Sequence, residues 1–323
     1  MKKWGWLIIR AGFSVGLLGL LFWRMDLRQF SDVYRNMNIL LFLTSLLSYL
    51  LLFILMSYRW QLLLRVLGIH TSIQRLYKTY LVGVFFNNFF PTAIGGDIIR
   101  GYNLYQYTQK GKETAISVII ERFLGSTSLL VIAVAGLALS YPWFYDPVLA
   151  GLILAAFLVY LIVLFVMLTP TTFILIDRFL QKFKIKTLGS KLLKIPEVIS
   201  IYRSSPHLLL RLIIFSLFIQ SLAIIIYYIL CHSLHLEIPL VYVFLFFPVI
   251  NIVSMIPISL GGLGIREGIS IYLFEKIGVV PAHAMGLSLA WYFIILCISA
   301  LGGAIYAFGD ANRLISPGST DKV

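Results

Sequence analysis

Two stretches of the sequence share one pattern of residues, and this pattern decides the fold. Residues 91–101 read PTAIGGDIIRG and residues 257–268 read PISLGGLGIREG, so both fit P-x-x-x-G-G-x-x-x-R without a gap. Each stretch ends a short apolar run, residues 77–90 in the first case and 240–256 in the second. Proline ends a helix because it lacks the backbone N–H and clashes with the preceding turn, and paired glycines permit a tight turn. The pattern therefore predicts two helices that break at the same motif.

The composition places these broken helices in a membrane. Hydrophobic residues make up 60% of the 323 residues and charged residues 12%, whereas soluble proteins contain about 45–50% and about 25%. The mean hydropathy is +0.95. A transmembrane helix needs about 20 mostly apolar residues, and six segments reach this length: 4–23, 39–57, 115–140, 148–168, 208–231 and 283–308. Together with the two broken segments, they predict an all-α polytopic integral membrane protein of about eight membrane segments, with a single transmembrane domain over residues 1–308.

The basic residues predict how the chain lies in the membrane. We take the segments around 77–105 and 240–275 as re-entrant, so that each begins and ends on one side of the bilayer. With the N-terminus in the cytoplasm, the cytoplasmic segments then hold 17 of the 26 Lys and Arg residues, Arg59 among them, and the external segments hold four. Cytoplasmic segments are enriched in Lys and Arg. This favours a multi-pass protein of the cell membrane with both termini in the cytoplasm.

In that orientation the first break enters from the cytoplasm and the second from outside. This is the arrangement of an inverted-topology transporter repeat, in which broken helices line the substrate site. Backbone that leaves the helix at membrane depth must be buried in protein or line a polar cavity, because lipid cannot satisfy its N–H and C=O groups. The alternative is two ordinary proline–glycine breaks that only assist packing.

Three peripheral segments carry weaker predictions. Residues 4–23 could be a signal peptide, but no A-x-A-like site follows, which favours an uncleaved first helix. Residues 169–207 contain seven Lys and Arg residues and predict an amphipathic cytoplasmic connector on the anionic inner leaflet, or a docking site for a soluble partner. Residues 309–323 are a short polar tail, which we expect to be disordered.

The charged residues at membrane depth are the candidates for function. Each costs at least about 2.5–3.5 kcal/mol to insert, and the planar fork of arginine suits phosphate. We therefore expect a cavity for an anionic, phosphate-bearing headgroup; the alternative is that these residues only pair with one another to hold the bundle. The substrate-binding candidates are Arg100, Arg266, Asp97, Glu267, Glu121, Arg122, Asn88 and Asn251, and the backbone-turn candidates are Pro91, Gly95, Gly96, Pro257, Gly261 and Gly262.

Roles can be assigned to some of these candidates. Arg100 and Arg266 occupy matched motif positions, and we expect them to bind the headgroup phosphate. Asp97 and Glu267 would orient the arginines or contact a cationic headgroup. Asp97 and Arg100 are spaced i, i+3 and could share a helix face. The partner of Arg122 stays open between Asp97 and Glu267, and Asp97 is also a candidate proton carrier.

Other classes of function have little support in the sequence. It contains no H-E-x-x-H, C-x-x-C, Walker or G-x-S-x-G motif, so we expect no enzyme, no cofactor and no metal site. A nucleic-acid binder would need a soluble basic domain. Two alternatives to a transporter stay open: a membrane-embedded enzyme that modifies a lipid headgroup, with Asp97 and Glu121 as its only candidates, and a non-catalytic anchor subunit.

The motifs resemble those of a known family. Residues 88–100, the pair Glu121-Arg122 and residues 257–268 together are similar to the lysylphosphatidylglycerol synthase transmembrane-region family, a flippase-like group of integral membrane proteins, and the likeness covers nearly the whole chain. In two-domain members the membrane part is implicated in moving an aminoacylated phospholipid between leaflets, and a soluble aminoacyl-transferase domain follows it. The resemblance implies a lipid flippase or scramblase, without synthesis in this chain. Its partner would be a phospholipid or a polyprenyl- or hopanoid-type lipid, and its oligomeric state is not predicted.

Overall fold

The computed structural model describes residues 27–89, 95–169, 206–256, 259 and 261–308, together with positions 12, 14, 16–21 and 23. Every regular element in these ranges is an α-helix, which confirms the all-α polytopic membrane class. Several predictions lie outside the described residues: most of the first segment 4–23, both prolines of the motif (Pro91 and Pro257), almost all of the connector 169–207, and the tail 309–323.

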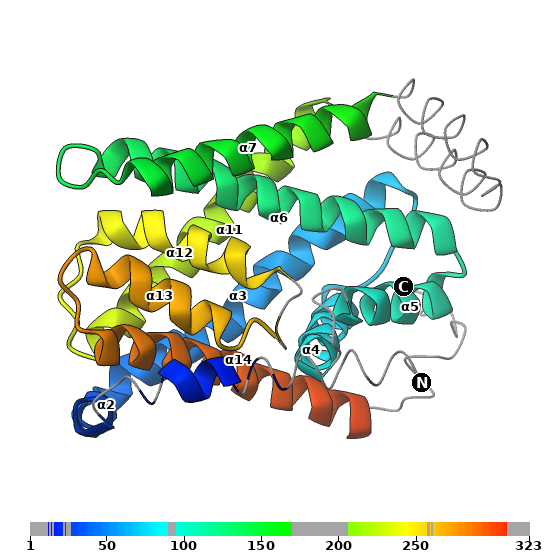
Figure 1. The fold of residues 1–323 in the computed structure, drawn as a ribbon. Coiled ribbons are helices and arrows are strands. Elements are labelled where there is room, and N and C mark those ends of the chain that lie inside the picture. Colours follow the sequence, from blue (N-terminus) through cyan, green and yellow to red (C-terminus); the bar gives the residue numbers. More distant parts are fainter. Residues whose placement is uncertain are drawn as a thin grey trace.

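Long apolar helices build the bundle. Within the described ranges, five helices are long and apolar enough to cross a membrane, and they extend from one end of the molecule to the other (Figure 1). The total number of spans stays a prediction, because the first apolar segment is mostly outside those ranges. The five helices are α3 (Ile39–Val66), α6 (Gly111–Ser140), α7 (Pro147–Leu168), α11 (Pro206–Ser233) and α14 (Pro281–Phe308).

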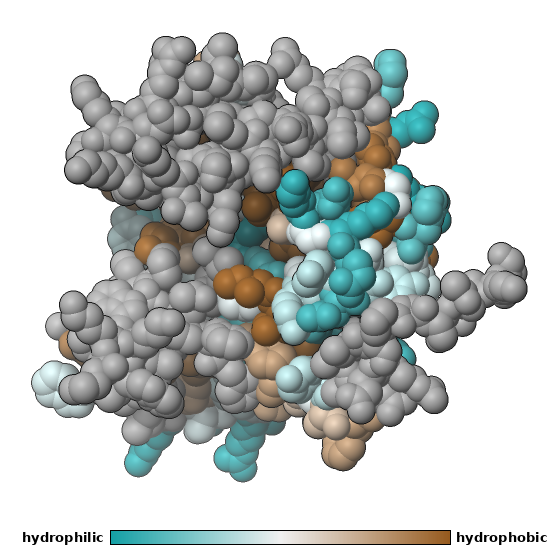
Figure 2. Space-filling view, turned by 90° about the vertical axis from the view of Figure 1, so that its right-hand side faces the viewer, coloured by the Kyte–Doolittle hydropathy of each residue, from teal (hydrophilic) through white to brown (hydrophobic). Residues whose placement is uncertain are grey.

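Two pairs of shorter helices occupy the predicted broken segments. The first pair is α4 (Ile73–Phe89) with α5 (Gly95–Thr108), and the second is α12 (Leu240–Ser254) with α13 (Ile265–Glu275). The first pair lies toward the end of the bundle at which α6 begins, and the second lies toward the opposite end (Figure 1). Hydrophilic side chains gather on the end at which α5 lies (Figure 2).

One further helix was not predicted. α2 (Leu27–Arg35) lies in a stretch that the sequence suggests is an external loop, and it packs on α14. Its Val33 is buried, and the Tyr34 hydroxyl donates a hydrogen bond of 2.8 Å to the Gly286 carbonyl. A helix of nine residues with a polar face is too short and too polar for a search for membrane spans to detect.

Close helix contacts fix the position of α4, whose C-terminal turns carry site residues. A Cβ atom added at Gly302 of α14 would lie 2.0 Å from the Leu81 carbonyl oxygen of α4. A Cβ atom at Gly96 of α5 would lie 2.0 Å from the Gly83 carbonyl oxygen on the other side of α4. Glycine therefore lets α4 pack backbone to backbone against both α5 and α14.

Candidate functional site

A network of buried charges joins α3, α4, α5 and α6. Glu121 lies at its centre: its Oε1 accepts hydrogen bonds from Arg59 and from the Tyr80 hydroxyl, and its Oε2 accepts one from Arg100 at 3.1 Å. Arg100 also donates to Asp97 at 3.2 Å, the i, i+3 pairing that the sequence suggests. Arg100 and Glu121 are both about 95% buried, at 5% and 4% exposure. Paired in this way, the charges hold four helices together.

Aromatic rings complete the surroundings of Arg100. Its guanidinium lies 3.6 Å from the ring centroid of Tyr80 and 4.5 Å from that of Trp60. The Trp60 Nε1–H donates to the Ser117 hydroxyl at 3.0 Å, which fixes this ring. Two carboxylates and two aromatic faces thus surround Arg100. These surroundings fit a residue that stabilises helix packing better than they fit one that binds phosphate.

Arg59 is the member of the network that sequence reasoning missed. Its count among the cytoplasmic charges is wrong: Arg59 is 1% exposed, it is paired with Glu121, and it donates to the Ser216 hydroxyl of α11 at 2.8 Å. The predicted span ended at residue 57, whereas α3 continues to Val66. An arginine two turns before the end of a long apolar helix was the signal that could have revealed it.

Arg122 pairs with Asp97, which settles the choice left open by the sequence. The Arg122 side chain is 31% exposed, whereas the Asp97 side chain is 11% exposed. Asp97 thus lies between two arginines, since Arg100 contacts its other oxygen. Of the paired charges described so far, the Arg122 guanidinium is the one with substantial access to its surroundings.

The first break is closed by an asparagine side chain. Asn87 Oδ1 accepts a hydrogen bond of 2.7 Å from the Gly96 backbone N–H, at the start of α5. Gly95 and Gly96 already belong to the first turn of α5 and do not have positive φ. Neither glycine therefore makes a left-handed turn here, and Gly96 allows the close approach to α4.

The second break uses its glycines differently. Gly261, Gly262 and Gly264 have φ angles of 58°, 81° and 86°, in the left-handed region that favours glycine. The Arg266 Nη2 donates a hydrogen bond of 3.0 Å to the Gly261 carbonyl and so stabilises this turn. The two motifs therefore match in sequence but fold into different local structures.

Glu267 caps α13 instead of orienting Arg266. It is fully buried, with 0% exposure, and its Oε2 accepts from the Gly264 backbone N–H at 2.6 Å. Its Oε1 accepts from the Ser288 hydroxyl of α14 at 3.1 Å. Both oxygens are used, and the carboxylate completes the N-terminus of α13 as the glutamate of a capping box does.

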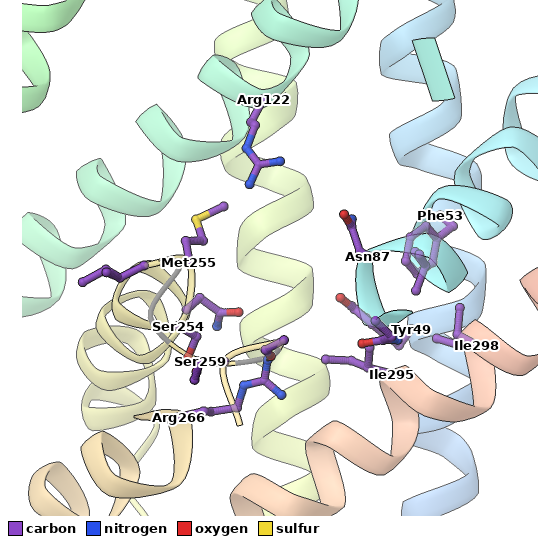
Figure 3. A pocket seen from close by; sticks show the side chains of 16 residues that line it. Tyr49, Phe53, Asn87, Arg122, Ser254, Met255, Ser259, Arg266, Ile295 and Ile298 are labelled. Atoms are coloured by element: carbon purple, nitrogen blue, oxygen red, sulfur yellow. The ribbon is translucent and has the colours of Figure 1, made fainter. Parts of the chain in front are cut away.

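A polar cavity of about 240 Å³ lies between the two breaks. Arg122 reaches into it from α6, and Arg266 reaches into it from α13 on the other side (Figure 3). No aspartate or glutamate is among its lining residues within the described ranges. Besides Tyr49, the polar lining consists of Asn87, Asn88, Arg122, Asn251, Ser254, Ser259 and Arg266.

Three residues that line this cavity have buried polar atoms without a partner in the described part of the chain. Arg266 Nη1, Asn88 Nδ2 and Ser259 Oγ are buried and have no hydrogen-bond partner within the described part of the chain. Asn251, by contrast, donates through Nδ2 to the Phe247 carbonyl at 2.8 Å. An unsatisfied buried donor costs about 1–3 kcal/mol. These atoms are therefore suited to a ligand that offers hydrogen-bond acceptors, or to water.

A second cavity, of about 300 Å³, adjoins the first and contains the charge network. Asn87 and Arg122 line both cavities, as do Tyr49 and Met255. Asp97 and Glu121 line the second cavity and not the first. The acids thus belong to one cavity and Arg266 to the other, with Arg122 between them. Among the described residues, no three His, Cys, Asp or Glu side chains group closely enough to hold a metal ion.

Comparisons with known proteins agree with the motifs and the fold. Over 306 residues the chain is 24% identical to a UPF0104 membrane protein from Methanothermobacter thermautotrophicus, a match that covers 88% of this chain and 90% of the relative. No solved structure matches the chain. The family model described as the lysylphosphatidylglycerol synthase TM region matches residues 7–303. The chain therefore belongs to the lysylphosphatidylglycerol synthase transmembrane-region family of membrane proteins.

Proposed function

We propose that this protein is a lipid flippase or scramblase that moves an anionic, phosphate-bearing lipid or lipid-linked headgroup across the bilayer. The observation that carries the proposal is the cavity between the breaks, where Arg266, Asn88 and Ser259 have buried polar atoms without partners in the described structure. Phosphate oxygens accept charge-assisted hydrogen bonds from arginine. A phosphate in this cavity would satisfy donors that are otherwise costly to bury.

The three arginines have three different roles in this proposal. Arg266 binds the headgroup phosphate, because among the described residues one of its nitrogens has no partner and no carboxylate lines its cavity. Arg100 positions the helices, because it is held by Asp97 and Glu121. Arg122 lines both cavities and transfers the headgroup between them by exchanging its bond to Asp97 for one to phosphate.

The broken helices support an alternating path through the membrane. The α4–α5 pair and the α12–α13 pair lie toward opposite ends of the bundle (Figure 1), as the halves of an inverted-topology repeat do. Together with the distribution of Lys and Arg, this supports a cell-membrane protein with both termini in the cytoplasm. A headgroup entering beside one break would leave beside the other.

The alternative functions have less support. A lipid-modifying enzyme would need a free acid or base, and its candidates Asp97 and Glu121 are each bound by two arginines. A soluble partner at residues 169–207 stays a prediction, because this segment lies almost wholly outside the described residues. We propose membrane lipid as the partner and transport as the activity.

Lipid transport in proteoliposomes tests the proposal. Purified protein is reconstituted with fluorescent phosphatidylglycerol, and dithionite removes the fluorescence of the outer leaflet, with and without a proton gradient. We expect wild type to expose inner-leaflet lipid to dithionite. Arg266→Gln should slow this by about 10-fold or more, since hydrogen bonds to charged groups contribute about 1.5–3 kcal/mol.

The matched control is Arg65→Gln. Arg65 is exposed near the end of α3, outside both cavities, and donates to Gln61. Its replacement should leave the transport rate unchanged. Equal rates for wild type, Arg266→Gln and protein-free liposomes would refute the proposal.

A further inference from the structure

An apolar groove lies on the membrane-facing side of the molecule, between α6, α7, α12 and α13. We name it the tail groove; its volume is about 260 Å³, and all its lining residues are apolar except one tyrosine, Tyr272. Ala133 and Ile153 form its buried part, at 1% and 5% exposure, whereas Leu152 at its rim is 64% exposed. The groove is therefore open to the hydrocarbon of the bilayer and has the composition that an acyl chain requires.

The last turns of α12 separate this groove from the Arg266 cavity. Asn251 and Ser254 of these turns line the polar cavity, and Ile252 and Val253 line the tail groove. Ile256, just beyond the end of the helix, lines both. The polar cavity and the apolar groove are therefore neighbours around the end of α12.

The charges of the cavity indicate which headgroup can occupy it. Its described lining holds Arg122 and Arg266 together with amide and hydroxyl groups, and it holds no carboxylate. Glu267 is next to Arg266 in sequence, but both its oxygens are used in capping α13. Asp97 is bound by two arginines in the adjoining cavity. An ammonium group would therefore meet positive charge and no acid, whereas a phosphate with hydroxyl groups would find partners.

We infer that one lipid binds on both sides of the end of α12, with an anionic phosphate–polyol headgroup in the Arg266 cavity and an acyl chain in the tail groove. The inference rests on the headgroup site of the proposed function and adds to it a second subsite and a headgroup class. Phosphatidylglycerol has this chemistry, and phosphatidylethanolamine, with its ammonium group, does not. An ordinary boundary lipid would fill the groove without regard to the headgroup, so headgroup selection is the property to test.

Photolabelling in nanodiscs tests the inference with the full chain. Phosphatidylglycerol and phosphatidylethanolamine carry the same diazirine-bearing acyl chain, and the labelled residues are mapped by mass spectrometry. We expect phosphatidylglycerol to label the tail groove, around Leu152 and Val253, at least about 5-fold more than phosphatidylethanolamine does. Arg266→Gln should reduce labelling by phosphatidylglycerol to the level of phosphatidylethanolamine, because the headgroup loses its charged partner.

A matched pair of alanines on α7 tests the groove itself. Ala156 lines the tail groove and Ala155 does not, and both are exposed, so the fold should tolerate either change. Ala156→Phe should fill the groove and remove most of the labelling there, and Ala155→Phe should leave it intact. Equal labelling by the two lipids in wild type, or no difference between the two alanine variants, would overturn the inference.

Labelling and transport can fail independently, because labelling at equilibrium requires no translocation. Headgroup-selective labelling by a wild-type protein that moves no lipid in liposomes would refute the proposed function and leave the binding site standing. Transport that depends on Arg266 but occurs without headgroup-selective labelling would refute lipid binding in the tail groove and would leave the proposed function intact.

Discussion

Replacing Glu121 with glutamine removes the central charge of the buried network at almost constant volume. In the described network, three arginines face two carboxylates, and the change leaves three arginines facing one. Arg100 would keep a charged partner, Asp97 at 3.2 Å. Arg59 would keep only neutral acceptors, the Ser216 hydroxyl at 2.8 Å and the new amide oxygen. Removing one partner of a buried ion pair costs about 3–5 kcal/mol. At about 2–4 °C per kcal/mol, the melting temperature should fall by about 6–20 °C.

The assay is thermal unfolding of the purified protein in detergent, followed by tryptophan fluorescence. Glu113→Gln is the control, because Glu113 lies in the first turn of the same helix and is partly exposed; it should change stability by less than about 0.5 kcal/mol. The double replacement of Arg59 and Glu121 by methionine should cost less than the sum of the single replacements, since it leaves fewer unpaired charges. A Glu121→Gln protein that melts within about 2 °C of wild type would refute the structural role of the network.

Two further predictions concern helix contact and pH. Gly302→Ala should lower the free energy of unfolding by about 1–3 kcal/mol, because its Cβ would lie 2.0 Å from a carbonyl oxygen of α4. The control Gly268→Ala has open space around its Cβ and should not lower it. Equal melting temperatures for the two variants would contradict the close packing at Gly302. Outside the spans, the hydrogen bond from Lys276 holds the pKa of Asp146 below its usual value of 3.8. The ion pair therefore contributes stability that is complete above this pH and is lost as the pH falls through the lower, folded-state pKa. The difference in melting temperature between wild type and Asp146→Asn should shrink from pH 6 to pH 3, and a constant difference would contradict it.

The broken helices could be predicted because their signals are local. Proline and paired glycines act within a few residues, and α5 and α13 begin at Gly95 and Ile265, within the two motifs. The cap of α13 could not be predicted in the same way, because a capping box has Ser or Thr three residues before the glutamate and Gly264 occupies that position. A glutamate at membrane depth predicts a site residue instead.

The environments of the matched arginines could not be predicted, because they come from other helices. Arg100 and Arg266 hold the same motif position, yet Arg100 meets Glu121 of α6, whereas Arg266 lies 5.2 Å from the Tyr292 ring of α14. Arg59 pairs with a residue 62 positions further along the chain. Such partners depend on which helices pack together, and a single sequence does not record this.

Electron cryo-microscopy of the protein in nanodiscs of phosphatidylglycerol would show where the lipid headgroup binds. We expect lipid phosphate within hydrogen-bond distance of Arg266 Nη1, the buried nitrogen that has no partner in the described structure. Arg100 should remain enclosed by Asp97 and Glu121 in the same map. A cavity that holds only water, with phosphate bound at Arg100 instead, would refute the role of Arg266 as the phosphate ligand.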